Sequence, residues 1–170
     1  AVTAATYVDA FDISSQEFNP QGFTFNNDGT KMFLTGNNGD DVNEYTLSTG
    51  FDVSTASFVD SFDISSQEEG PRDLAFNADG TKMFVVGVLG DDVNEYTLST
   101  AFDVSTSTFV DSFDISSQEN SPTGLAFSKD GTKMFVAGNG GDDINEYTLS
   151  TGFDVSTASF VDSFDVSSQD

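Results

Sequence analysis

Short apolar segments alternate along the whole chain with punctuation that is rich in Gly and Asp. Near-continuous apolar runs such as KMFLTG (31–36) are typical of strands that are buried on both faces. The segment VNEYTLS alternates instead, which predicts Tyr45 and Leu47 on one face of a strand and Glu44 on the other. No segment keeps the helical period over a useful length. The pattern therefore predicts an all-β protein.

The same pattern is written three times at a fixed spacing of 51 residues. FNNDGTKMF (25–33) returns as FNADGTKMF (76–84) and as FSKDGTKMF (127–135). Each period holds four strand-like segments, which we name a to d, with an Asp-Gly turn between a and b and a Gly-Asp-Asp turn between b and c. In the first strand d, Phe58, Phe62 and Ile64 are predicted to share one face.

The order LAFSKDGTKMFVAG…DDINEYTLST resembles a blade of a β-propeller of the WD-repeat and YVTN type. The chain has no Trp and no His, so it lacks the Trp-Asp pair and the Gly-His signature of WD repeats. The resemblance spans essentially the whole chain and implies four-stranded antiparallel blades at 18–68, 69–119 and 120–170, with residues 1–17 as a surplus outer strand d. A β-trefoil, which also has three four-stranded repeats, is the alternative fold.

Three blades are fewer than the roughly four to eight that close a propeller. Two apolar sheet faces would be left open, which predicts self-association, most simply as a homodimer with six blades or else as a homotrimer with nine. The surplus segment Thr6 to Ser14 could then pair with strand c of a neighbour's third blade and displace, or compete with, Ser159 to Val166 of that neighbour. Alternatively the chain is a fragment of a longer array of blades.

Composition removes several classes of function. The chain has 29 acidic and 5 basic residues, a net charge of -24, and such a surface repels nucleic acid and anionic membranes. With no His and no Cys, the chain has neither Ser-His-Asp nor Cys-His catalysis available. Nearly every Asp recurs in every repeat, whereas an active site needs one asymmetric set. We expect a non-enzymatic protein, extracellular or on a particle surface, and a carboxylate- or calcium-dependent propeller hydrolase is an alternative.

Acidic turns are the candidate metal sites. The Asp-Gly turn fails the EF-hand pattern because Thr24 stands at its first ligand position. Calcium is a possible ligand at the Gly-Asp-Asp turns, where Glu17, Glu68 and Glu119 are expected on the same side. The other interpretation of paired Asp residues is a solvated turn. The candidate metal ligands are Asp40, Asp41, Asp91, Asp92, Asp142 and Asp143.

Variation among the repeats is concentrated in the d–a and b–c loops, which emerge on one rim of a blade because its strands alternate in direction. A variable rim on a constant frame is typical of a recognition surface for a protein or glycan. The alternatives are drift in unused loops and a purely structural scaffold of duplicated or designed repeats that binds no ligand. The candidate ligand-binding residues are Phe18, Asn19, Gln21, Asn37, Asn38, Glu69, Arg72, Asp73, Val88, Leu89, Asn120, Thr123 and Asn139.

Overall fold

Each repeat folds into its own four-stranded antiparallel sheet in a computed structural model that describes residues 5–168. The first sheet consists of β1 (Pro20–Phe25), β2 (Lys31–Gly36), β3 (Asp41–Leu47) and β4 (Ala56–Asp63). The second consists of β5 (Pro71–Phe76), β6 (Lys82–Gly87), β7 (Asp92–Leu98) and β8 (Ser107–Asp114). The third consists of β9 (Pro122–Phe127), β10 (Lys133–Gly138), β11 (Asp143–Leu149) and β12 (Ala158–Asp165). The predicted strands a to d are confirmed in every repeat.

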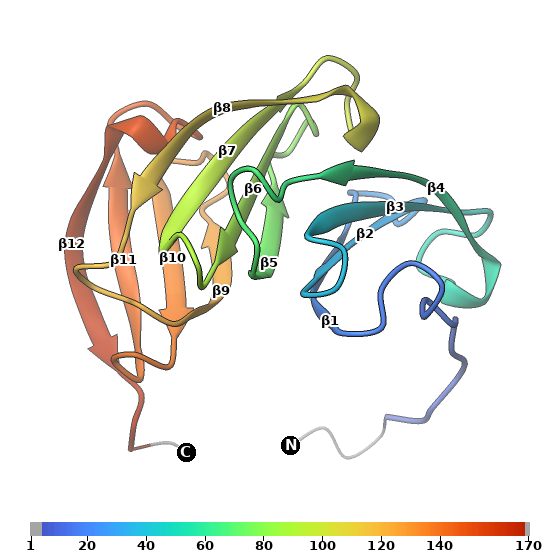
Figure 1. The fold of residues 1–170 in the computed structure, drawn as a ribbon, viewed down its shortest axis with the longest axis horizontal. Coiled ribbons are helices and arrows are strands. Elements are labelled where there is room, and N and C mark those ends of the chain that lie inside the picture. The colour runs from blue at the N-terminus through green and yellow to red at the C-terminus, as the bar shows by residue number, and fades with distance from the viewer. Residues whose placement is uncertain (1–4, 169–170) are drawn as a thin grey trace.

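The three sheets stand side by side as blades around an arc, with β1, β5 and β9 innermost and β4, β8 and β12 outermost (Figure 1). Neighbouring strands along the chain pair within each blade, which is the meander of a propeller blade. The β-trefoil alternative is wrong, because each repeat forms a separate sheet. The predicted surplus strand (1–17) begins, and the third predicted blade (120–170) ends, outside the described residues.

Two apolar cores lie between the blades. Phe33 of β2 and Val42 of β3 pack with Leu74, Met83 and Tyr96 of the second blade. An equivalent cluster joins the second blade to the third. Strand b contributes to both faces of a blade, since β2 and β6 are almost entirely buried. The near-continuous apolar runs were therefore a correct indication of double burial.

Strand d differs from its prediction because it is bulged. Glu44 pairs with Asp60 but Tyr45 pairs with Phe58, so Val59 is an extra residue. A bulge of one residue reverses the side to which the following side chains point. The ring of Phe58 consequently contacts Tyr45 within its own blade, whereas Phe62 contacts Tyr96 of the next blade. The prediction that Phe58 shares a face with Phe62 and Ile64 is wrong for this reason.

Short 3-10 helices η1 (Val53–Thr55), η2 (Val104–Thr106) and η3 (Val155–Thr157) occupy the links between strands c and d. Each link contains a Phe in the left-handed backbone region, at Phe51, Phe102 and Phe153. That ring covers the Gly of the a–b turn, which also has a positive φ. Of the helices in residues 5–168, none is long and apolar enough to cross a membrane.

Candidate assembly and binding surfaces

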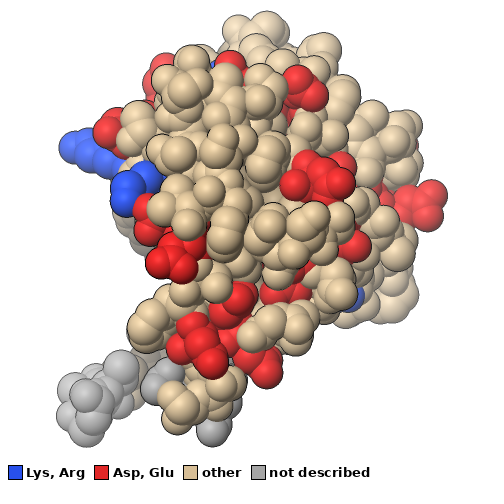
Figure 2. All heavy atoms as spheres, turned by 90° about the vertical axis from the view of Figure 1, so that its left-hand side faces the viewer, with Lys and Arg blue, Asp and Glu red and all other residues tan. Residues whose placement is uncertain are grey.

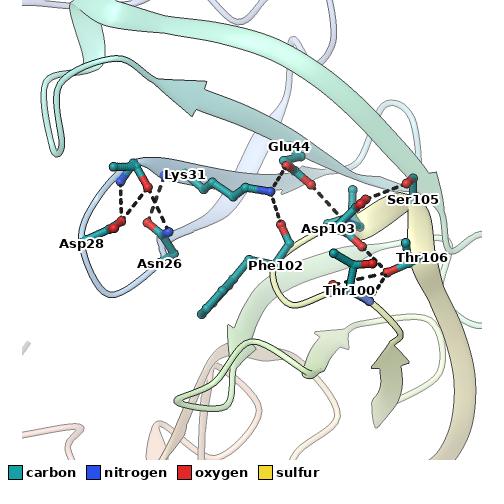
Figure 3. A network of polar contacts seen from close by, with 11 residues as sticks. Asn26, Asp28, Lys31, Glu44, Thr100, Phe102, Asp103, Ser105 and Thr106 are labelled. Carbon is teal, nitrogen blue, oxygen red and sulfur yellow. Dashed lines mark hydrogen bonds and ion pairs between the residues drawn. The ribbon is translucent and has the colours of Figure 1, made fainter.

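A polar clamp joins the first blade to the second (Figure 3). The Lys31 Nζ on β2 donates to Glu44 Oε1 on β3 at 2.6 Å and to the Phe102 carbonyl at 2.6 Å. The second carboxylate oxygen of Glu44 accepts from the Val104 N–H at 3.0 Å. The Glu44 side chain is only 2% exposed, so its charge is paired and hydrogen-bonded in a buried position.

The same clamp recurs between the second and third blades. Lys82 donates to Glu95 at 2.5 Å and to the Phe153 carbonyl at 2.6 Å, and Glu95 accepts from the Val155 N–H at 3.0 Å. Both clamps connect residues with the same offsets along the chain, so they are a property of the repeat. The clamps were not predicted from the sequence, although the Lys of DGTKMF and the Glu of NEYTL recur in every period.

The third clamp is only half made. Lys133 donates to Glu146 at 2.5 Å, but within residues 5–168 neither side chain reaches a further blade. Lys133 is 52% exposed and Glu146 is 30% exposed, against 29% and 2% for the first pair. These two side chains therefore present an unused carbonyl-binding ammonium and an unused carboxylate oxygen on the open face of the third blade.

The open face of the third blade forms an apolar groove of about 720 Å³. Phe164 on it is 67% exposed and Ile144 is 40% exposed, whereas the equivalent Val93 of the second blade is buried beneath the third. Uncharged residues cover much of the side of the molecule on which β12 lies, with carboxylates scattered among them (Figure 2). The groove is lined by Gly124, Leu125, Ala126, Phe135, Ala137, Ile144, Glu146, Asp162, Ser163 and Phe164.

The opposite end of the arc is the back face of the first blade, which faces away from the second blade. Phe23 on this face is 62% exposed, whereas the equivalent Leu74 of the second blade is 3% exposed. Tyr45 and Leu47 are nevertheless buried here, together with Met32 and Leu34. The segment before β1 covers them.

That covering segment takes the position of a preceding blade's strand d. The ring centroids of Phe11 and Tyr45 are 5.8 Å apart at an interplanar angle of 80°. The corresponding pair between the first and second blades, Phe62 and Tyr96, has 5.7 Å and 81°. Residues 5–13 form no ladder in the single chain, since strand c of a preceding blade is not beside them. Residues 5–13 of the predicted surplus strand thus lie where an outer strand would, without being paired as one.

Buried glutamates hold the rim loops together. Glu17 is fully buried and accepts from the N–H groups of Asn19, in the d–a loop, at 2.6 Å and of Asn38, in the b–c loop, at 3.1 Å. Glu68 and Glu119 bind the corresponding loops of the other blades in the same way. The d–a and b–c loops therefore lie on one rim, as their connectivity predicted.

The Gly-Asp-Asp turns have a different role for each Asp. The first, such as Asp40, stands in the left-handed backbone region that the turn requires. The second accepts from an Asn side chain on the same strand, as Asp41 does from Asn43 at 2.6 Å. Asp91, Asp92, Asp142 and Asp143 repeat this arrangement.

Burial disfavours negative charge at the first of these turns. Burial, and to a smaller extent the neighbouring Glu17, raises the pKa of Asp41. Burial also raises the pKa of Tyr45 to about 12, and its hydroxyl has no hydrogen-bond partner. No group of three acidic side chains within residues 5–168 gathers closely enough to hold a metal ion. Calcium binding at these turns stays a prediction.

Three of the predicted ligand-binding residues meet across the first two blades. Arg72 donates to Gln21 at 2.8 Å, and Asn37 accepts from Arg72 at 3.1 Å when its amide is oriented to satisfy both of its atoms. Asp73 is turned inward and accepts from the Leu125 N–H of the third blade at 2.9 Å. These four polar residues take part in contacts between blades.

The remaining predicted ligand-binding residues lie on the rim and are not gathered into one site. Phe18 and Leu89 are 71% and 66% exposed, which makes them the most exposed apolar side chains of the rim loops. Their part in ligand binding stays a prediction. The others are Asn19, Asn38, Glu69, Val88, Asn120, Thr123 and Asn139, of which Val88 is half-buried and the rest are exposed.

No protein-family model matches the sequence, and no curated protein matches it. Solved structures do resemble it. A functionally unknown protein from Desulfotomaculum acetoxidans has a TM-score of 0.62 and 18% identity, covering 88% of this chain and 43% of its own. The Pseudomonas aeruginosa periplasmic gluconolactonase PpgL has a TM-score of 0.57 and 19% identity, covering 87% of this chain and 41% of its own.

The β-propeller domain of Myceliophteria thermophila Cps50 (Swd1) has a TM-score of 0.55 and 13% identity, covering 86% of this chain and 43% of its own. The chain thus has the β-propeller fold. It spans about two-fifths of the length of the solved chains that it resembles.

Proposed function

We propose that this chain is a non-enzymatic assembly module, which closes a six-bladed ring by associating head to tail with a second copy. The observation that carries the proposal is the half-made clamp of Lys133 and Glu146. By the 51-residue spacing, its missing partners are the Phe51 carbonyl and the Val53 N–H on the back face of the first blade. Phe51 is 61% exposed there, so it is accessible to a partner.

The two open faces also match in size. Gly124 and Ala137 on the open face of the third blade stand where the second blade has Asp73 and Val86, so they leave the apolar groove deeper. The residue that would enter from a second copy is Phe23, which is larger than the Leu that occupies its position in the other blades. A large side chain opposite two small ones maintains the packing density of a protein interior. This compensation favours a second copy of this chain as the occupant.

A non-enzymatic role is supported by what the repeated carboxylates do. Glu17, Glu68 and Glu119 accept from backbone N–H groups, and Glu44 and Glu95 are engaged in the blade clamps. Carboxylates held in this way brace loops and blades in every repeat. The lactonase activity in the name of the Pseudomonas protein belongs to that protein, since 19% identity supports the fold alone.

The test is the molar mass in solution, measured by light scattering on a sizing column. We expect twice the mass of the 18.1 kDa chain. Lys133→Glu would place a second carboxylate beside Glu146 at the unmade clamp, and we expect it to weaken association by about tenfold or more.

Lys129→Glu is the matched control, because it makes the same change in charge on the exposed a–b turn of the same blade. It should leave the mass at two chains. Equal effects of the two substitutions would contradict ring closure through this face. A mass of one chain at every concentration would also contradict it, if a variant lacking residues 1–12 has that mass too.

A further inference from the structure

Two segments of the chain are built for one seat on the back face of the first blade. We define this seat as the surface formed by Met32, Leu34 and Tyr45, which Phe11 and Ile13 cover. Phe164 and Val166 stand at the equivalent positions on the outer strand of the third blade. In a closed six-bladed ring, the third blade of a second copy would bring its Phe164 to the place that Phe11 occupies. The two phenyl side chains cannot occupy this place together.

We propose that β12 of a second copy displaces residues 5–12 from this seat, whereas Ile13–Glu17 of the chain stay bound. The handover from one chain to the other then lies between Phe164 of the second copy and Ile13. The inference rests on the proposed ring closure and specifies its junction. It also assigns residues 5–12 a role as a removable cover of the seat in the single chain.

Backbone pairing decides which strand yields. β12 pairs with β11 from Asp143↔Asp165 to Leu149↔Ala158, so releasing it would break a complete ladder. Residues 5–12 form no backbone ladder, and Tyr7 and Val8 among them are 83% and 89% exposed. Releasing these residues costs the side-chain contacts of Phe11, which Phe164 of the second copy replaces. The exchange therefore loses little and keeps every strand pair.

The turn that follows is anchored in its own chain. The N–H groups of Gln16 and Glu17 both donate to the Ile13 carbonyl at 2.9 Å, and the buried Glu17 carboxylate ties this turn to Asn38 in the b–c loop. Ile13 and Glu17 also repeat the residues found at these positions in the internal blades, Ile64 with Glu68 and Ile115 with Glu119. Ile13–Glu17 of the same chain therefore fit this part of the surface better than the corresponding residues of a second copy would.

The terminal segment of the second copy is less suited to that turn. It carries Val166, which is smaller than Ile, and Asp170, which is shorter than Glu and lies outside the described residues. The residues just before β12 are well suited to an outer strand. Thr157 accepts from the Thr151 N–H at 3.2 Å and donates to the Asp154 carbonyl at 2.8 Å. Thr55 makes the same two contacts in the first blade. The aligned residue of the covering segment is Ala4, which has no hydroxyl.

A matched pair of substitutions tests the proposal by sedimentation velocity over a dilution series. Phe164→Asp changes a side chain that is 67% exposed in the single chain, and we expect the Kd for association to rise by about tenfold or more. Phe11→Asp weakens the cover, and we expect the Kd to fall while the mass stays at two chains. Circular dichroism checks that both variants keep the β-sheet content of the wild type.

A second pair locates the handover. Ile13→Asp is expected to weaken association and Val166→Asp to leave it unchanged, because only Ile13 remains in the ring interface. Loss of the dimer in Phe11→Asp with its retention in Phe164→Asp would overturn the proposal, since the covering segment would then be the strand exchanged between chains. Equal effects of Phe11→Asp and Phe164→Asp would overturn it too.

Failure of ring closure itself has a different signature. If the wild type has the mass of one chain, a variant lacking residues 1–12 is measured under the same conditions. A dimer in that variant supports the cover and shows that it dominates in the full chain. A single-chain mass in every variant refutes both proposals, whereas a dimeric wild type with the wrong contrast between Phe11 and Phe164 refutes only the cover.

Discussion

Three of the chain's few cationic side chains, Lys31, Lys82 and Lys133, are placed at the same point of each blade. Each pairs with a Glu on the adjacent strand c and, where a further blade follows, with a carbonyl of that blade. A partly buried ion pair contributes little by itself, but removal of one partner leaves the other charge uncompensated. The clamps therefore act chiefly by fixing how neighbouring blades meet.

Aspartates of the a–b turns give the fold a dependence on acid pH. Asp130 accepts from the Ser128 and Thr132 hydroxyls and from the Thr132 N–H, and these bonds lower its pKa from 3.8 to about 2. Because the folded state holds this proton less tightly than the unfolded chain, the contribution is present above about pH 4 and is lost as the pH falls toward 2.

We expect Asp130→Asn to flatten the decline of Tm between about pH 4 and pH 2. Thermal melts at half-unit pH steps measure the slope. Asp111→Asn, the same change on the exposed outer strand β8, is the control. Parallel Tm curves for the wild type and Asp130→Asn would show that the turn does not act in this way.

At the scale of the element, the inner strands β1, β5 and β9 decide how closely the blades approach. A side chain on Gly22 of β1 would meet the Asp73 Cα at 2.6 Å and the Arg72 carbonyl oxygen at 2.8 Å. A side chain on the equivalent Gly124 of β9 has only the Ala137 Cβ at 3.6 Å and an Asp73 oxygen at 4.0 Å nearby. The same glycine is thus packed where a blade follows it and open where none does.

Gly22→Ala should destabilise the single chain by about 1–3 kcal/mol, because neighbouring backbone must move. Gly124→Ala should leave the stability of the single chain unchanged but weaken its association, since the first blade of a second copy would approach Gly124 as β5 approaches Gly22. Urea unfolding measures the first effect and sedimentation measures the second. Unchanged association of Gly124→Ala would argue against the same approach at the ring junction.

The whole molecule combines apolar end faces with a net charge of -24. Long-range repulsion between two such chains opposes their association. Salt screens this repulsion, and the Debye length is about 10 Å at 0.1 M. A clamp completed at the proposed junction would be short and partly buried, as the two clamps between blades of one chain are, so salt would weaken it less. Repulsion is therefore expected to control how association responds to ionic strength.

We expect the Kd for association to fall severalfold when NaCl is raised from about 0.05 M to about 0.5 M. Sedimentation equilibrium at a series of salt concentrations measures the change, and sucrose of matched osmolality controls for solvent exclusion. A Kd that rises with salt would mean that the ion pairs at the junction, rather than net charge, dominate association.

The sequence by itself determined the number of blades, the four strands of each and the double burial of strand b. The strands and their burial depend on local periodicity and turn chemistry, which are visible in one period. The number of blades follows from how often that period of 51 residues recurs. It also indicated the common rim of the d–a and b–c loops, because antiparallel neighbours alternate in direction.

Only the tertiary structure decided which surfaces meet. The side of Phe58 depends on a bulge in the pairing of two strands, which no alternation in strand d reveals. The partner of Lys31 lies 71 residues away in another blade, and Phe11 takes a seat that belongs to strand d of a preceding blade. Such contacts are set by how separate sheets approach in space. The half-made clamp of Lys133 and the surface that Phe11 covers could therefore be identified only from the fold.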